Sequence, residues 1–413
     1  MAEIIASTVN LNKLSETTYR KLNARIEETV RARVAPAVAI AIFHNDMSIL
    51  DVAWGWHDPD TKNFPVHTSS LFDLASLTKI YTSLAFFSLI TEEKISLHSR
   101  LVDVIPEFGN LSSRAIDGGQ DPFSKEVLPV DERFKGQSVN PSDVTFFHLL
   151  THTAGLPAWR DVFSVADAPL EPPQPDTISR AERWSRALER LCQFSFVGFP
   201  ESGVRYSDVG MMLLGEAVSR LHGTPGKLDE AIKARVLTDK LRHTMFTPLY
   251  NKVLHHQIVP TEMDATWRKR RVWGEVHDEN ACGAGGIAGH AGLFATAHDV
   301  ALLGNFYLNH VERILKIDPE LALAATELQA QTDDLRRGLA WLLKAPVGAM
   351  VGDRFSPSSY GHSGFTGTTL WIDPQANLVV VLLTNSVWGG RENDGIYELR
   401  RAIHDIIHEG LVS

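Results

Sequence analysis

Residues 72–79 read Phe-Asp-Leu-Ala-Ser-Leu-Thr-Lys, and an apolar run, 80–90, follows them directly. The run predicts a helix that starts near Ser76. Positions three apart share a helix face, so the Ser76 hydroxyl and the Lys79 amine come within hydrogen-bonding reach. A serine hydroxyl needs a base beside it, and a lysine serves only if burial or a neighbouring cation lowers its pKa. A capping serine followed by a surface lysine is the alternative interpretation of this motif by itself.

The two ends of the chain predict strands and flanking helices. Residues 37–54 hold two apolar runs around a His44-Asn45-Asp46 turn, a pattern typical of a β-hairpin. Strand patterns return at 338–343, 367–372 and 378–384. Helical apolar stripes precede the hairpin, from a cap near Ser15 to Pro36, and follow the last strand. The stripe residues are Leu14, Leu22, Ile26 and Val30 at the start, and Ile396, Leu399, Ile403 and Ile406 at the end.

The middle of the chain has mostly helical patterns, broken by polar segments at 112–137 and 161–176 that we expect to be surface loops. Since terminal strands can share one sheet, the sequence predicts an α/β fold. We expect an antiparallel sheet flanked by the N- and C-terminal helices, with an inserted, mostly helical domain. The predicted boundaries place 1–95 and 335–413 in the α/β domain and 96–334 in the helical domain.

The composition excludes several classes of protein. The 413 residues carry 40 Lys+Arg against 50 Asp+Glu, a formal net charge of −10. An acidic balance without a basic run argues against a nucleic acid or an anionic membrane as the main partner. The longest apolar run is too short to span a bilayer. Cys192 and Cys282 show no metal-ligand spacing and cannot form a framework of bridges.

The first ten residues lack the basic and apolar stretches of a secretory leader. We therefore expect a cytoplasmic protein, or a periplasmic or secreted one if a leader was removed.

Two further motifs accompany Ser76 and Lys79. Tyr206-Ser207-Asp208 precedes an apolar helical pattern, and residues 361–367, Gly-His-Ser-Gly-Phe-Thr-Gly, run into a predicted strand. The set resembles the serine β-lactamase and penicillin-binding-protein superfamily, with its transpeptidase-like fold. Within it, the set is similar to the class C-like branch that includes esterases, D-amino-acid peptidases and N-acetylmuramyl-L-alanine amidases. Residues 149–157 and 285–294 also resemble stretches of this family.

The resemblance implies a role for each motif residue. Ser76 is the expected acylated nucleophile, Lys79 takes or relays its proton, and Tyr206 is the partner base and later the acid to the leaving group. Which of Lys79 and Tyr206 is the base stays open, because coupled groups share their titration. The backbone N–H groups of Ser76 and Phe365 are the expected oxyanion hole. The implied substrate-binding residues are Asp208, His362, Ser363 and Gly364.

Two residues depart from the family pattern. Asp208 stands where the family usually has asparagine, and an ionised aspartate only accepts hydrogen bonds. It is expected to hold Lys79 charged more firmly, or to favour a substrate with an amine or hydroxyl there. His362 replaces the lysine that helps β-lactamases hold the antibiotic carboxylate. Because a neutral imidazole is a weaker anion anchor, we expect another ester or amide substrate rather than β-lactams.

Other histidines have competing interpretations. Residues 277–280, His-Asp-Glu-Asn, with His290 nearby, suggest either a metal site or a loop that lines the cleft. We favour the loop, because the superfamily needs no metal. This stretch also resembles one in the N-acetylmuramyl-L-alanine amidase subgroup, which indicates cell-wall fragments as substrates. His152, in a Thr-His-Thr-Ala-Gly turn, is predicted to order that turn rather than to take part in catalysis.

The sequence thus predicts a serine hydrolase that forms an acyl-enzyme on an ester or amide bond. We expect a small-molecule or short-peptide substrate, such as a small ester, a D-amino-acid peptide or a peptidoglycan fragment. No cofactor and no metal are implied, and the oligomeric state stays open. The alternatives are a β-lactamase or D,D-carboxypeptidase, or a penicillin-binding-type sensor that is acylated but never turns over.

Overall fold

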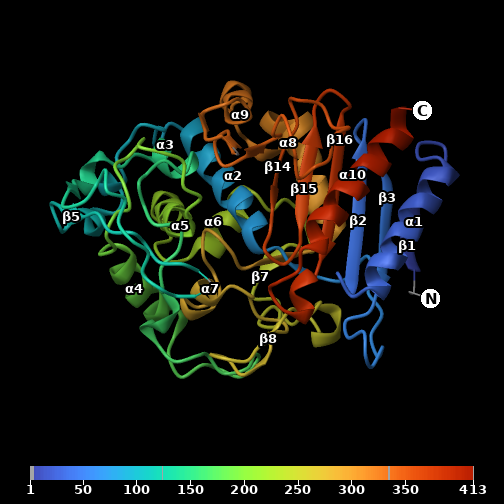
Figure 1. Cartoon of the computed structure of the whole chain (residues 1–413), viewed down its shortest axis with the longest axis horizontal. Helices are drawn as coiled ribbons and strands as arrows, with labels where there is room; N and C mark the ends of the chain where they lie inside the picture. Colours follow the sequence, from blue (N-terminus) through green and yellow to red (C-terminus); the bar gives the residue numbers. More distant parts are fainter. Residues whose placement is uncertain (1–3, 123, 334, 413) are drawn as a thin grey trace.

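The computed structural model describes residues 4–122, 124–333 and 335–412, and its largest feature is one antiparallel sheet (Figure 1). Within these residues the sheet has nine strands, in the order β1-β3-β2-β16-β15-β14-β13-β12-β11. β16 from the C-terminal part pairs with β2 from the N-terminal part, with Val381 opposite Ala41. The strands are β1 (Ile4–Val9), β2 (Ala37–His44), β3 (Met47–Gly55), β11 (Ala330–Gln331), β12 (Arg336–Arg337), β13 (Leu342–Leu343), β14 (Tyr360–Ser363), β15 (Thr369–Asp373) and β16 (Leu378–Thr384).

The helices cover both faces of this sheet and form a separate cluster at one side of it (Figure 1). α1 and α10 contact each other on one face, and α8 packs on β2, β15 and β16 on the other. The helices are α1 (Glu16–Arg31), α2 (Thr78–Thr91), α3 (Phe146–Leu150), α4 (Arg180–Leu191), α5 (Asp208–His222), α6 (Leu228–Arg235), α7 (Glu279–Gly283), α8 (Ala297–Leu315), α9 (Pro319–Ala325) and α10 (Gly395–Val412).

β2 shows how one strand places buried side chains on both faces of the sheet. Because successive strand residues point to opposite sides, Val38, Ile40 and Ile42 pack with α1 and α10, whereas Ala39 and Ala41 belong to the core that contains α8. Both sets are buried. A strand that is apolar on both sides must lie between two layers of helices, and this arrangement confirms the predicted α/β fold class.

Several local predictions are confirmed and others are wrong. The hairpin and the Ser15 cap occur as predicted, and the Ser15 side chain accepts a hydrogen bond from Thr18 N. The strand predicted at 338–343 is instead broken, because Gly338 N bonds Trp341 O in a tight turn between β12 and β13. β1 was not predicted. The domain boundaries near residues 95 and 335 stay a prediction.

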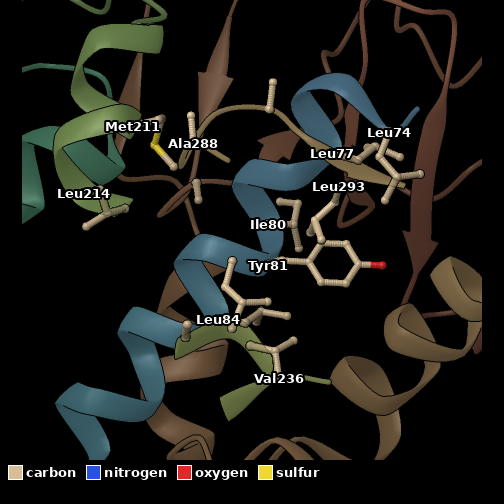
Figure 2. Close-up of a cluster of buried hydrophobic side chains, with 14 of the residues drawn as sticks. Leu74, Leu77, Ile80, Tyr81, Leu84, Met211, Leu214, Val236, Ala288 and Leu293 are labelled. Atoms are coloured by element: carbon tan, nitrogen blue, oxygen red, sulfur yellow. The ribbon is translucent and has the colours of Figure 1, made fainter. Parts of the chain in front are cut away.

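α2 holds the predicted Ser76–Lys79 motif in the middle of the molecule. Its residues are buried on all sides through most of its length, as expected for an apolar helix that lies in a core. Figure 2 shows Ile80, Tyr81 and Leu84 of α2 in one buried cluster with Met211 and Leu214 of α5. α2 therefore joins the large sheet to the helical cluster, and both parts can bring side chains to its first turn.

Short strands surround the start of α2. β4 (Phe72–Asp73) pairs with β10 (Leu293–Ala295), which pairs with β7 (Met245–Phe246). Two other pairs lie in the loop regions, β5 (Arg114–Ala115) with β6 (Ser138–Val139) and β8 (Met263–Asp264) with β9 (Arg270–Arg271). Among the described residues, no helix has both the length and the apolar character needed to cross a bilayer.

Candidate active site

Ser76 lies in a 3₁₀ turn, Ala75–Leu77, immediately before α2 rather than inside it. Ala75 has a φ of +46°, a conformation that is costly for a residue with a side chain. Asp73 stabilises the turn, since one carboxylate oxygen accepts from Ala75 N at 2.8 Å and the other from His277 N at 2.6 Å. Sequence reasoning quoted Asp73 only as part of a family-like stretch and missed this role.

Lys79 reaches back from the first turn of α2 to the serine. Its Nζ donates to Ser76 Oγ at 2.6 Å and to the carbonyl of His290 at 3.3 Å. The same ammonium lies 2.8 Å from Asp208 Oδ1, at the start of α5. Lys79 is only 1% exposed, so the surface-lysine alternative is wrong. Three segments far apart in the sequence therefore meet at one nitrogen.

The charge state of Lys79 depends on two opposing effects. Burial by itself lowers the pKa of the ammonium, but the Asp208 carboxylate and Tyr206 outweigh it, so the pKa of Lys79 is raised above its usual value. Lys79 could act as the base only if its pKa were lowered, and this condition is therefore not met. Asp208 holds Lys79 charged, as predicted from its departure from asparagine.

This coupling predicts the effect of Asp208→Asn on the pH dependence. If the protonated Lys79 is the active form, a raised pKa keeps the enzyme active to higher pH. Removing the carboxylate lowers that pKa, so we expect the basic limb of the kcat/KM profile to move down by about one pH unit or more. The profile is measured with a neutral ester, and Asp103→Asn, at an exposed Asp103–Arg100 pair, is the control. An unmoved or upward-shifted limb contradicts this prediction.

Tyr206 is positioned by the residue that follows it. Ser207 caps α5, accepting from Gly210 N at 3.0 Å and donating to Pro157 O at 2.7 Å. Its own N–H donates to His152 Nδ1 at 3.1 Å. The His152 ring lies 4.7 Å from the Tyr206 ring, and Lys79 Nζ lies 4.7 Å from the Tyr206 ring centroid. His152 thus stabilises the start of α5 beside Tyr206, a structural role that acts through Ser207 rather than within its own Thr-His-Thr-Ala-Gly turn, where we predicted it.

The third motif docks onto the serine turn. Thr366 Oγ1 donates to Asp73 O at 2.9 Å, and Thr368 Oγ1 donates to Leu74 O at 3.1 Å. A Cβ on Gly364 would lie 2.6 Å from Leu74 O, so a side chain there would push β14 away from Ser76. Gly367 has a φ of +101°. Internal packing therefore requires glycine at 364, and the positive φ favours glycine at 367.

His362 is buried at 3% exposure in β14. Its Nδ1 donates to the carbonyl of Ser363 at 2.9 Å, which leaves Nε2 without a hydrogen-bond partner among the described residues. Burial, together with Arg337 and Lys79, holds the pKa of His362 well below its usual value. The ring is therefore neutral, lies 5.9 Å from the Tyr206 ring, and keeps one free nitrogen.

Two cavities meet at Ser76. Each is lined by Ser76, Tyr206, Phe365 and Arg391. The smaller, of about 280 Å³, also has Asp208 and Asp278 in its wall. The larger, of about 810 Å³, contains three further sequence-predicted residues and one that sequence reasoning missed: His362, Ser363, Gly364 and Arg337. The structure thus places every predicted site residue at the cavities or, for Lys79, directly behind them.

One group in the described part of the chain has the geometry for a metal ion: Asp208, Asp278 and His290, whose ligand atoms lie within 4.8 Å of one another. The protein already provides partners for them. Asp208 pairs with Lys79, and His290 Nε2 bonds Asp278 Oδ1 at 2.8 Å. Burial raises the pKa of Asp278, but His290 lowers it more, so the carboxylate stays ionised. A divalent ion here would have to displace the Lys79 ammonium, so the geometry favours a charge network.

Comparisons with known proteins match most of the chain. The family model described as "Beta-lactamase" matches residues 22–404. A protein of Salmonella agona named "Putative D-alanyl-D-alanine carboxypeptidase" is 28% identical over 377 residues, which cover 85% of this chain and 78% of that protein.

Two solved structures share the fold. One, described as "EstCE1, a hydrolase with promiscuous acyltransferase activity", has a TM-score of 0.67 at 20% identity, covering 95% of this chain and 99% of its own. The other, a D-amino acid amidase from Ochrobactrum anthropi SV3 complexed with D-phenylalanine, has a TM-score of 0.66 at 16% identity, covering 95% of this chain and 99% of its own.

Proposed function

This chain belongs to the beta-lactamase family, as its resemblance predicted, and from that premise we propose that it hydrolyses an ester or amide through an acyl-enzyme on Ser76. The observation that carries the proposal is the 2.6 Å contact between Lys79 Nζ and Ser76 Oγ at the junction of two cavities. Burying a charged lysine is costly even when it is paired, as Lys79 is with Asp208, so its position beside a half-buried serine supports a role in that serine's chemistry.

We assign the proton transfers mainly to Tyr206. Ser76 Oγ attacks the substrate carbonyl carbon while its proton passes to the Tyr206 oxygen. Tyr206 accepts this proton as a phenolate and becomes a neutral phenol, and the Lys79 ammonium, 4.7 Å from that ring, stabilises the phenolate before the transfer. Because the pKa of Lys79 is raised, it acts as a positive charge and not as the base. The backbone N–H groups of Ser76 and Phe365 are the proposed oxyanion hole.

The second half of the reaction reverses these transfers. When the tetrahedral intermediate collapses, the bond to the leaving group breaks and Tyr206 returns the proton to the departing oxygen or nitrogen. Water then attacks the ester on Ser76 and gives a proton to Tyr206, and Tyr206 passes this proton to the departing Ser76 Oγ as the acid and the free serine are released. Atoms and charges balance with water as the only co-substrate.

The proposed substrates are a small ester, a D-amino-acid peptide or a peptidoglycan fragment. The Salmonella relative's name favours D-amino-acid peptides, and with it the D,D-carboxypeptidase alternative. β-Lactam hydrolysis is the less favoured alternative, because the neutral His362 stands where β-lactamases use a charged lysine.

His362 is proposed to orient the substrate. We expect His362→Ala to raise KM about tenfold while kcat changes less than about threefold. The reason is that the variant loses a contact to the bound substrate but keeps every group that transfers a proton. Steady-state kinetics on one ester measures the split. His256→Ala, at an exposed histidine, is the control. A fall in kcat at unchanged KM would instead place His362 in the chemistry.

The proposed function is tested by intact-mass spectrometry. The protein is exposed to a panel of activated esters, D-peptides, muropeptides and penicillins, and we expect an acyl adduct that maps to Ser76. Time courses then separate the enzyme from an acylated sensor, since an enzyme turns over steadily and a sensor gives one stoichiometric burst. No adduct with any member of the panel and no turnover would refute the proposal.

A further inference from the structure

Arg337 is a buried cation without a counter-charge. Its side chain leaves β12 and lines the larger cavity, and the residue is 5% exposed. Nε and Nη1 are buried and have no hydrogen-bond partner among the described residues. No carboxylate in the described part of the chain forms an ion pair with it. Its guanidinium carbon lies over the Tyr206 ring, 5.0 Å from the ring centroid.

The groups around Arg337 do not neutralise it. His152 and His362 are both held neutral by burial and by the nearby positive charges. The apolar side chains of Leu335, Leu342 and Met350 line the same cavity. Burial lowers the pKa of Arg337 but cannot deprotonate a guanidinium near neutral pH. An unpaired charge in such surroundings is strongly destabilising, so this site is incomplete without an anion.

The other arginines of this cavity are already used. Arg391 bonds Glu262 and Glu279, each at 2.6 Å. Arg400 donates to the carbonyl of Gly364 at 2.9 Å and supports the strand. Among the arginines that line this cavity, Arg337 is therefore the one whose guanidinium N–H groups are available to a ligand. These groups form a planar fork that matches a carboxylate in geometry and charge.

We propose that Arg337 binds a carboxylate on the leaving group of the substrate. The leaving group is assigned to the larger cavity because Arg337, Tyr206 and the free Nε2 of His362 lie together there, and Tyr206 protonates the departing atom. The smaller cavity is assigned to the acyl group, because neither Arg337 nor His362 lines it. This inference rests on the proposed function and narrows its substrates to esters or amides whose leaving alcohol or amine carries a carboxylate.

The test uses two aryl acetates that differ in one charge. 3-Carboxyphenyl acetate and 3-carbamoylphenyl acetate share the acyl group and the reactive bond, but only the first has an anionic leaving group. We expect the wild-type protein to favour the carboxylate ester about tenfold or more in kcat/KM, the range of a charge-assisted pair. Arg337→Gln should bring this ratio close to one by slowing the carboxylate ester alone.

Two controls separate recognition from structure. Arg336→Gln removes the same charge from the neighbouring position of β12, whose side chain bonds Lys344 O, and should keep the wild-type ratio. Arg337→Gln should unfold at the same or a higher temperature than the wild type, since it removes an uncompensated buried charge. Arg337→Lys should regain part of the preference.

The outcomes are distinguishable. A wild-type ratio near one, an unchanged ratio in Arg337→Gln, or an equal loss with both esters would overturn the carboxylate site while Ser76 still forms its adduct. Failure of the wild type to hydrolyse either ester, without any adduct on Ser76, would instead refute the proposed function and the inference with it.

Discussion

Ser76→Ala is expected to reduce turnover of any accepted ester by about 10⁴-fold or more, because no other group can form the acyl-enzyme. Lys79, Asp208 and Tyr206 keep their mutual contacts in this variant, so substrate binding should persist. The measurements are steady-state hydrolysis and labelling by a fluorophosphonate probe, and both should be lost together.

Ser83→Ala is the matched control for this variant. Ser83 lies on the same helix and is buried, and its hydroxyl has no hydrogen-bond partner among the described residues. Its removal should therefore leave both turnover and labelling unchanged. If labelling survives in Ser76→Ala and disappears in Ser83→Ala, the labelled nucleophile is Ser83, and our assignment of Ser76 is wrong.

Tyr206→Phe should slow acylation by about a hundredfold or more, the usual contribution of a general acid–base group. The substitution keeps the ring between His152, Lys79 and Arg337 and removes only the hydroxyl. The site should therefore keep its geometry and lose its proton carrier. Single-turnover mixing with an activated ester measures the acylation rate directly.

Tyr19→Phe, on α1 at the opposite face of the sheet, is the control for the loss of a phenol. An acylation rate that is unchanged in Tyr206→Phe would show that the proton leaves Ser76 by another route. Lys79 would then be the base despite its raised pKa, and Asp208→Asn would move the acidic limb of the profile, rather than the basic limb, to lower pH.

The three motifs could be predicted from the sequence because each is local. Ser76 and Lys79 are three residues apart on one turn, Ser207 caps the helix that follows Tyr206, and the Gly361–Gly367 segment leads into a strand. Local spacing determines which side chains share a face, so these predictions needed no knowledge of the long-range packing. The same holds for the hairpin at 37–54 and the two terminal helices.

The errors arose where a distant residue decides the outcome. The pKa of Lys79 depends on Asp208, which is 129 positions away, and burial by itself predicts the wrong direction. Gly364 is required because Leu74 O lies against it, and no pattern around residue 364 reveals that contact. The 338–343 strand is interrupted by a turn that a run of apolar residues does not indicate.

The sequence by itself determined the family and the α/β fold class, and it predicted Ser76 as the nucleophile, because periodicity and motif spacing record short-range geometry. Only the tertiary structure decided that Lys79 stays charged and that Arg337 faces the cavity without a counter-ion. The charge state and the burial of a side chain depend on all of its neighbours in space. Those neighbours come from segments that only folding brings together.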